Sequence, residues 1–255
     1  SDGYYYIGPM SRNEPHGEGI EYYPNGNIFY EGDFVNGAKD GDGKMINSDG
    51  FYYIGQFSDN KYNGQGREFD DDDIKIYEGE FIDGVKHGKG IEYDDEGVIF
   101  YSGNYVNGYR EGRGVEYNKE GNKLYEGDFT NGFREGNGIE YDDEGDIAFE
   151  GSFSNGFRNG EGKSYLEGKL YYHGNYVDGN KNGRGKEYNY EGKIIFEGNY
   201  VNNVREGLGI EYNDEGTIVY QGNFVNNYRE DEYNEKETAD NIDEINDLLK
   251  QIDDM

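Results

Sequence analysis

Carboxylates are the side chains of this sequence with the clearest chemical potential. Residues 70–73 form an unbroken acidic run, and acidic turns recur at residues 94–97, 142–145 and 213–216. Clustered carboxylate oxygens are the ligands that Ca²⁺ prefers. Residues 39–43 look like part of a calcium loop, but Ala38 occupies the first ligand position and the 12-residue pattern fails. We therefore expect solvated acidic turns and no metal site.

Other candidate chemistry is equally weak. The Gly-x-Gly segments, such as Gly136-Asn137-Gly138, lack the third glycine and the Lys-Ser/Thr pair of a phosphate loop. The three histidines, His16, His87 and His173, do not recur at one repeat position. Cysteine is absent, and no pair of carboxylates is set apart for acid–base work. We expect no catalytic residue, no cofactor and no enzymatic activity.

A fixed period organises the whole chain. Copies of one unit begin at Tyr6, Tyr30, Tyr53, Tyr77, Tyr101, Tyr125, Phe149, Tyr172, Phe196 and Tyr220, at spacings of 23 or 24 residues. A constant period in this range indicates a repeat array, in which each unit contacts only its neighbours. Positions are numbered below from the first aromatic residue of each unit.

The composition restricts the class of protein. The chain of 255 residues carries 55 acids and 24 bases, a net charge of -31, and its mean hydropathy is -1.11. Such values are typical of disorder, but the 28 Tyr and 14 Phe recur mostly at fixed positions, which a disordered tract would not require. The acidic balance disfavours nucleic acid and anionic membranes as partners. No apolar run approaches the ~20 residues that span a bilayer.

Each unit predicts a β-hairpin. Residues at positions 1, 3 and 5, such as Tyr125, Gly127 and Phe129, share one face of a strand because side chains alternate. A turn follows at Asn131-Gly132, and Asn60, Asn203 and Asn227 replace glycine at position 8. Asparagine is the residue besides glycine that best tolerates the left-handed region, so backbone conformation selects this position. The glycines and a second strand, as at residues 139–141, complete the unit.

Stacked hairpins of this kind predict an all-β fold. We expect an elongated, single-layer, twisted antiparallel sheet that curls into a half-pipe, stabilised by contacts between rings of adjacent units. The array is predicted over residues 1–231. Because the chain starts inside a repeat, we expect it to be part of something longer.

The pattern Y-E-G-D-F-x-N-G-x-x-x-G-x-G-x-x-Y resembles the MORN (membrane occupation and recognition nexus) repeat. The resemblance covers Tyr4 to about Asp231, with glycines such as Gly127, Gly132, Gly136 and Gly138 at matching places. Position 5 is often Trp in that family, whereas this chain has none. The resemblance implies scaffold roles in cytoskeletal, ciliary or membrane-junction assemblies, an older idea of phospholipid binding, and a bacterial branch of antitoxin or immunity proteins.

The tail departs from the period after Asn227. Residues 232–255 predict a charged linker and then an amphipathic helix over about 239–253, since apolar residues recur at helical spacing at Ile242, Ile245, Leu248, Leu249 and Ile252. This helix is expected either to cap the last hairpins or to dock on another chain. Edge pairing or helix docking would also allow a homodimer.

The aromatic stripe is the candidate binding surface. Its rings either are consumed in packing between repeats or line a partner-binding groove, through Tyr77, Phe81, Tyr101, Tyr105, Tyr125, Phe129, Phe149, Phe153, Tyr172 and Tyr176. An acidic surface favours a basic or amphipathic segment as the partner.

Three functions remain open. The first is a non-catalytic scaffold, intracellular and cytoplasmic or cytoskeleton-associated, that binds a protein partner along the groove. The second is a phosphoinositide or membrane-surface module, in which the bases at position 10, such as Arg110, Arg134, Arg158 and Arg205, form a basic stripe along one rim. The third is an antitoxin, an immunity protein or a regulatory module of a larger enzyme.

Overall fold

The structure, a computed structural model, describes residues 3–236 and is nearly all β. The chain divides into two compact units, Ser1–Gly136 and Asn137–Met255, which are treated separately here. Residues 230–236 are helical, whereas the sequence predicts a charged linker from residue 232. The predicted amphipathic helix at 239–253, with Ile242, Ile245, Leu248, Leu249 and Ile252, lies outside the described residues.

The strands of the first unit are β1 (Tyr5–Ile7), β2 (Met10–Ser11), β3 (Glu14–Pro15), β4 (Gly17–Tyr22), β5 (Ile28–Val35), β6 (Ala38–Ile46), β7 (Tyr52–Ser58), β8 (Lys61–Phe69), β9 (Lys75–Ile82), β10 (Val85–Tyr93), β11 (Ile99–Val106), β12 (Tyr109–Tyr117) and β13 (Lys123–Thr130). Strand β14 (Phe133–Tyr141) spans the boundary. The second unit holds β15 (Ile147–Ser154), β16 (Phe157–Leu166), β17 (Lys169–Val177), β18 (Asn180–Tyr188), β19 (Ile194–Val201), β20 (Val204–Tyr212), β21 (Ile218–Val225) and β22 (Tyr228–Arg229).

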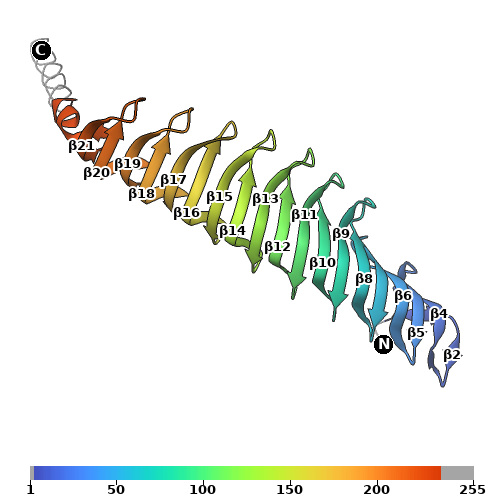
Figure 1. Cartoon of the computed structure of the whole chain (residues 1–255). Coiled ribbons are helices and arrows are strands. Elements are labelled where there is room, and N and C mark those ends of the chain that lie inside the picture. The colour runs from blue at the N-terminus through green and yellow to red at the C-terminus, as the bar shows by residue number, and fades with distance from the viewer. Residues whose placement is uncertain (1–2, 237–255) are drawn as a thin grey trace, which may run out of the picture. The chain divides into compact units, whose positions relative to one another are not determined.

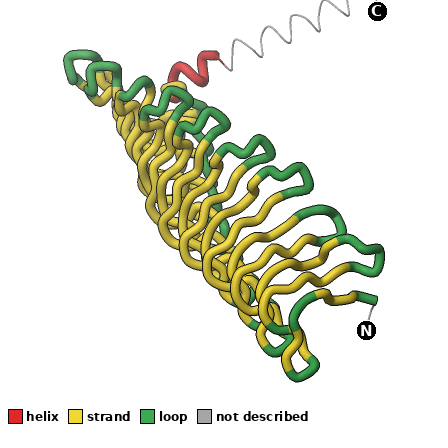
Figure 2. The backbone as a smooth tube through the Cα atoms, turned by 90° about the vertical axis from the view of Figure 1, so that its right-hand side faces the viewer, coloured by secondary structure: helices red, strands yellow, loops and turns green. Residues whose placement is uncertain are grey.

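In the first unit β1 pairs with β4, and β2 and β3 form a small sheet of their own. From β4 to β13, and from β15 to β22, the strands pair antiparallel with the next strand in chain order (Figure 1). The strands lie side by side and the loops gather at their two ends (Figure 2). The glycines at positions 3 and 14 pair with one another across successive strands, as in Gly103 with Gly114 and Gly114 with Gly127. Each unit is therefore an open antiparallel sheet of stacked hairpins with a row of glycines across its middle, as predicted.

The tip of each hairpin is a two-residue turn with both residues in the left-handed region. Asn131 has φ 50° and Gly132 has φ 87°. Asn60, Asn203 and Asn227 at position 8 have φ 66°, 72° and 71°, which confirms that backbone conformation selects this position.

Each tip is also bonded to the preceding hairpin. The backbone N–H of Gly132 donates to the carbonyl of Arg110 at 3.0 Å, and that of Gly108 donates to Lys86 at 2.9 Å. Where position 8 is Asn, the side chain adds a return bond: the backbone N–H of Lys181 donates to Oδ1 of Asn203 at 2.8 Å. The turns thus link hairpins as well as closing them.

The opposite ends of the hairpins are closed by a side chain at position 18. Oδ1 of Asp94 accepts the backbone N–H groups of Glu96 and Val98 at 3.0 and 2.8 Å. Asn118, Asn189 and Asn213 make the same pair of bonds. The first residue of these turns is therefore a structural acceptor, whereas the sequence suggested only solvent exposure.

The aromatic rings form the core. All ten rings predicted to line a groove are 0–3% exposed: Tyr77, Phe81, Tyr101, Tyr105, Tyr125, Phe129, Phe149, Phe153, Tyr172 and Tyr176. Tyr101 packs edge-on against Tyr105 of its own hairpin and Phe129 of the next, with centroids 5.7 and 5.2 Å apart. The expectation that these rings line an accessible groove is therefore corrected, because packing between hairpins consumes them.

Candidate functional site

Each hairpin presents two faces of different chemistry. On the face called here the aromatic face, Tyr125 at position 1 pairs with Glu116 at position 16 of the preceding strand, and Tyr105 at position 5 pairs with Arg110 at position 10. The opposite face, called here the polar face, carries positions 2, 4, 13 and 15. Side-chain alternation along the strands separates these two sets.

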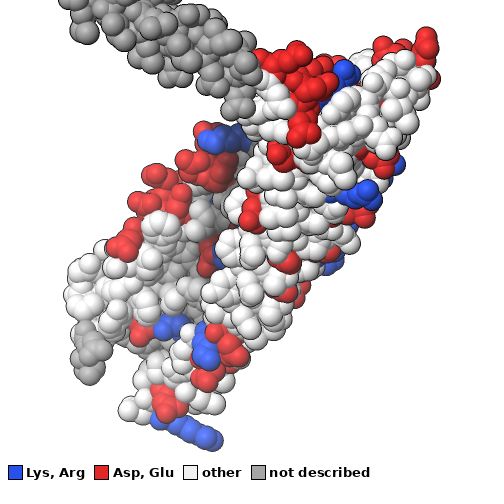
Figure 3. All heavy atoms as spheres, turned by 90° about the vertical axis from the view of Figure 1, so that its left-hand side faces the viewer, with Lys and Arg blue, Asp and Glu red and all other residues white. Residues whose placement is uncertain are grey.

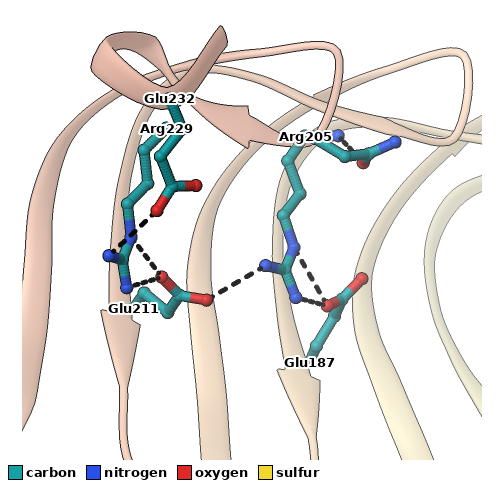
Figure 4. Close-up of polar contacts among 6 residues, drawn as sticks. Glu187, Arg205, Glu211, Arg229 and Glu232 are labelled. Atoms are coloured by element: carbon teal, nitrogen blue, oxygen red, sulfur yellow. Dashed lines mark hydrogen bonds and ion pairs between the residues drawn. The ribbon is translucent and has the colours of Figure 1, made fainter. Parts of the chain in front are cut away.

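A ladder of ion pairs covers the aromatic face. Arg110 donates from Nε to Glu92 of the preceding hairpin at 3.1 Å and from Nη1 to Glu116 of its own hairpin at 3.2 Å. Its guanidinium lies 4.1 Å from the centroid of the Tyr101 ring. Figure 4 shows the same arrangement at Arg205 and Arg229, which meet at Glu211. Arg110 and Arg205 therefore each join two hairpins and cover a buried ring.

In this ladder, burial and the charge of the partner shift the pKa values of the side chains in opposite directions. Burial lowers the pKa of Arg110, but the bonds and charge of Glu92 outweigh it and raise that pKa. Burial raises the pKa of Glu187, but Arg205 reverses the shift and lowers it. The partners thus hold each other in their charged forms.

Two copies of the repeat depart from this ladder of ion pairs. Position 10 of the third copy is Tyr62, and position 16 of the copy before it is Met45, so base and acid are missing together. Tyr62 instead stacks on Tyr53 with centroids 3.8 Å apart. Where Ser164 replaces the acid, Lys181 contacts Glu187 of its own hairpin at 3.6 Å, and burial lowers its pKa.

The ladder corrects the expected basic stripe. The bases at position 10 do recur at the repeat spacing, but on strands and with acidic partners rather than along a free rim. Arg134 reaches Glu116 at 2.6 Å, and Arg158 reaches Glu140 at 2.6 Å. These side chains are largely enclosed, with 18% of Arg110 exposed, so they are engaged in the fold rather than offered to anionic lipid.

The glycine row has no room for side chains on the aromatic face. A Cβ on Gly114 would lie 2.4 Å from the hydroxyl of Tyr101, and one on Gly103 would lie 2.2 Å from the same atom. These glycines therefore point toward the aromatic face, where the tyrosine ring fills the space. Several of these glycines are themselves buried, such as Gly66, Gly114 and Gly185, so the surface of the polar face is formed mainly by the side chains at positions 2, 4, 13 and 15.

Hollows lie on the polar face within both units. In the first unit, hollows of about 740 and 440 Å³ share Gln65 and Glu78 in their walls. In the second unit, a hollow of about 690 Å³ is walled by residues such as His173, Arg184 and Leu208. We call these hollows the glycine channel of each unit. Their side-chain walls come from positions 2, 4, 13 and 15, for which the sequence predicted no function.

The channel walls are nearly neutral although the chain is strongly acidic. They contain six bases and five acids: Lys44, Arg67, Lys89, Arg113, Arg184 and Lys186, with Glu31, Asp42, Glu78, Glu161 and Glu197. The full chain has 24 bases against 55 acids. The excess acid therefore lies elsewhere.

The described residues give no sign of a metal centre or a membrane span. Within residues 3–236, no three His, Asp or Glu side chains are placed to hold an ion together. In that same part of the chain, no helix is both long enough and apolar enough to cross a bilayer.

Comparison with known families identifies the repeat. A family described as MORN repeat matches residues 30–51, 53–73, 77–98, 101–123, 125–147, 149–166 and 196–217. A second, described as MORN repeat variant, matches residues 15–36 and 181–202. Together these segments cover well over half of the chain. No curated protein matches the sequence as a whole.

Proposed function

The chain belongs to the MORN repeat family, and from that premise we propose that it is a non-catalytic interaction scaffold that holds a protein segment in its glycine channel. Repeats of this family are generally protein- or membrane-binding modules and are typically non-catalytic. The recurrence of hollows at the same repeat positions in both units carries the proposal.

The geometry of the channel suits an extended peptide. Its walls offer amide, carboxylate and cationic groups from successive repeats, so an elongated ligand meets the same kinds of contact at regular intervals. Gln65 and Glu78 line both hollows of the first unit, which makes the channel continuous there. Because acids and bases are nearly balanced in the walls, we expect a segment of mixed charge rather than a uniformly basic one.

The pairing of the position-10 bases with acids favours a protein partner over a membrane. The position-10 cations are paired with glutamates, as in Arg110 with Glu92 and Glu116. Recruiting them to anionic lipid would leave these carboxylates enclosed without partners, which is costly.

Photo-cross-linking tests the channel directly. A benzoylphenylalanine placed at Gln65, whose side chain is exposed between two hollows, should cross-link a defined partner in an extract of the source cells. The matched control places the same group at Asn122, an exposed residue of a turn. We expect the partner at Gln65 and not at Asn122.

Two results would reject this proposal. Identical cross-linking from both positions would show that the channel is not the contact surface. Flotation of the protein with phosphoinositide vesicles, without any cross-linked protein, would favour the membrane alternative.

A further inference from the structure

The hairpin tips of the first unit carry a strip of exposed apolar side chains. Val106 and Tyr109 face each other across one tip, and Ile82 and Val85 across the tip before it. Together with Phe133 they are 41–58% exposed. We call these five residues the tip strip. They lie at positions 6 and 9, and Val106 follows the channel-wall residue Asn104 by two positions on the same strand.

Backbone hydrogen bonds make the strip continuous. The bonds from Gly108 to Lys86 and from Gly132 to Arg110 hold each tip against the hairpin before it, at 2.9 and 3.0 Å. The three tips therefore stand in register. Neighbouring strands lie ~4.8 Å apart, so successive hairpins place their tips about 10 Å apart.

Acidic residues flank the strip. Positions 4, 7 and 11 of these three hairpins hold no Lys or Arg and five acids: Glu80, Asp83, Glu111, Asp128 and Glu135. A carboxylate oxygen of Glu111 accepts the backbone N–H of Asn131 at the next tip, at 3.1 Å, which places this acid beside the strip. Figure 3 shows one face of the molecule, on which acidic side chains are more widespread than basic ones.

We propose that the tip strip docks an amphipathic helix of a partner protein, with an apolar seam bordered by Lys or Arg. Seven residues of α-helix rise about 10.5 Å, so a heptad seam brings one apolar group to each hairpin. Basic residues beside the seam meet the flanking acids. This surface adjoins the glycine channel, because Glu80 and Asp128 occupy position 4, which also contributes to the channel walls. The inference does not depend on a ligand in the channel.

A designed peptide tests the strip. The probe is a 22-residue helix with leucine at heptad spacing and lysine on both sides, and its binding is measured by fluorescence anisotropy. The wild-type chain should bind it, and Tyr109→Ser/Phe133→Ser should raise the dissociation constant at least about tenfold, since exposed aromatics dominate such contacts. Tyr190→Ser removes an exposed ring in the other unit and should leave binding unchanged.

Charge reversal gives a second reading that does not depend on the rings. Glu80→Lys/Asp128→Lys should also weaken binding of the lysine peptide, and it should strengthen binding of a matched peptide with glutamate in place of lysine. A scrambled peptide and a proline-rich peptide of the same charge should bind weakly. The proposal is overturned if the lysine, glutamate and scrambled peptides bind alike, if the Tyr109/Phe133 variant binds as wild type, or if no binding occurs at millimolar peptide. Far-UV circular dichroism establishes that each variant remains folded.

Discussion

At the scale of single residues, the base at position 10 performs three tasks. Arg110 neutralises Glu92 and Glu116, covers the ring of Tyr101, and so joins two hairpins. The sequence shows the recurrence of this base, but it gives no sign of its partners, because the acids that bind it are 6 and 18 residues away. Pairing across strands in this register becomes visible only in the folded sheet.

Arg110→Ala should destabilise the protein by about 2–3 kcal/mol, because hydrogen bonds to charged groups contribute about 1.5–3 kcal/mol and two enclosed carboxylates lose a partner. Denaturant titration followed by circular dichroism measures the change. Arg113→Ala is the matched control: its side chain is 64% exposed and reaches Asp128 only at 3.8 Å, so its loss should matter little. Equal effects of the two substitutions would contradict the role assigned to the ladder.

Gly114→Ala should destabilise by about 1–3 kcal/mol, the usual cost of overpacking, because the new Cβ would lie 2.4 Å from the hydroxyl of the Tyr101 ring. Thermal unfolding measures the loss. Gly132→Asn is the control, since this position is left-handed and the chain already carries Asn60, Asn203 and Asn227 there. We expect the control to unfold close to the wild-type temperature, and a larger loss at Gly132 than at Gly114 would count against the steric account.

At the scale of the element, each hairpin is closed at both ends by side chains with defined acceptors. The tip bonds reach the preceding hairpin, and the position-18 side chain holds the turn between hairpins. Asp94 and Asn118 make equivalent bonds, which explains why both residue types occur at this position. The neighbouring acids at positions 19 and 20 have no such requirement.

Asp94→Ala should speed amide exchange at Glu96 and Val98, because both N–H groups lose their acceptor. The cost in stability should be about 1 kcal/mol, as for loss of a capping side chain. Hydrogen-exchange mass spectrometry measures the first effect and denaturant titration the second. Asp94→Asn should behave as wild type, and Asp95→Ala should leave exchange unchanged. Faster exchange in all three variants would show that charge, not the acceptor, matters.

The sequence predicted hairpins, their tips and the repeated glycines because these depend on local preferences. Asn131-Gly132 is a turn signal by itself, and a fixed period places it in every copy. Whether the rings are accessible to a partner could not be predicted from local preferences, because Tyr101 is buried by Phe129 of another hairpin. The glycine channel could not be predicted, because its walls combine side chains at positions 2, 4, 13 and 15 of several hairpins, which only the pairing of the strands brings together.

At the scale of the whole molecule, stability rests on many buried tyrosines. Burial raises the pKa of Tyr62 and of Tyr176 to about 12, and it raises the pKa of Tyr77, Tyr101 and Tyr200 further. The causes are desolvation first and nearby carboxylates or rings next. The folded state therefore binds these protons more tightly than the unfolded state does.

The protein should unfold steeply as the pH rises above about 10. The pKa values of these tyrosines in the folded state exceed the value of about 10 in the unfolded state. Their contribution to the free energy of unfolding is therefore fully present below pH 10, and it is lost as the pH rises to about 12 and beyond. Each such group contributes about 1.4 kcal/mol per pH unit in that window. Tyrosinate absorbance and circular dichroism should change together. Tyr77→Phe should raise the midpoint, and tyrosinate formation without loss of structure would contradict this account.

The paired exception at Met45 and Tyr62 has a consequence for how this gene can change. Units that repeat every 23 or 24 residues invite unequal recombination, which would add, delete or permute hairpins without disturbing the backbone register. Yet a position-16 glutamate such as Glu116 is bonded by the bases of two hairpins, so moving the Tyr62 hairpin behind one that ends in Glu would remove one of the two bases of an enclosed carboxylate. Recombination that preserves each acid–base neighbour pair is tolerated and recombination that separates one is penalised, so the order of the copies carries inherited information that their shared consensus does not.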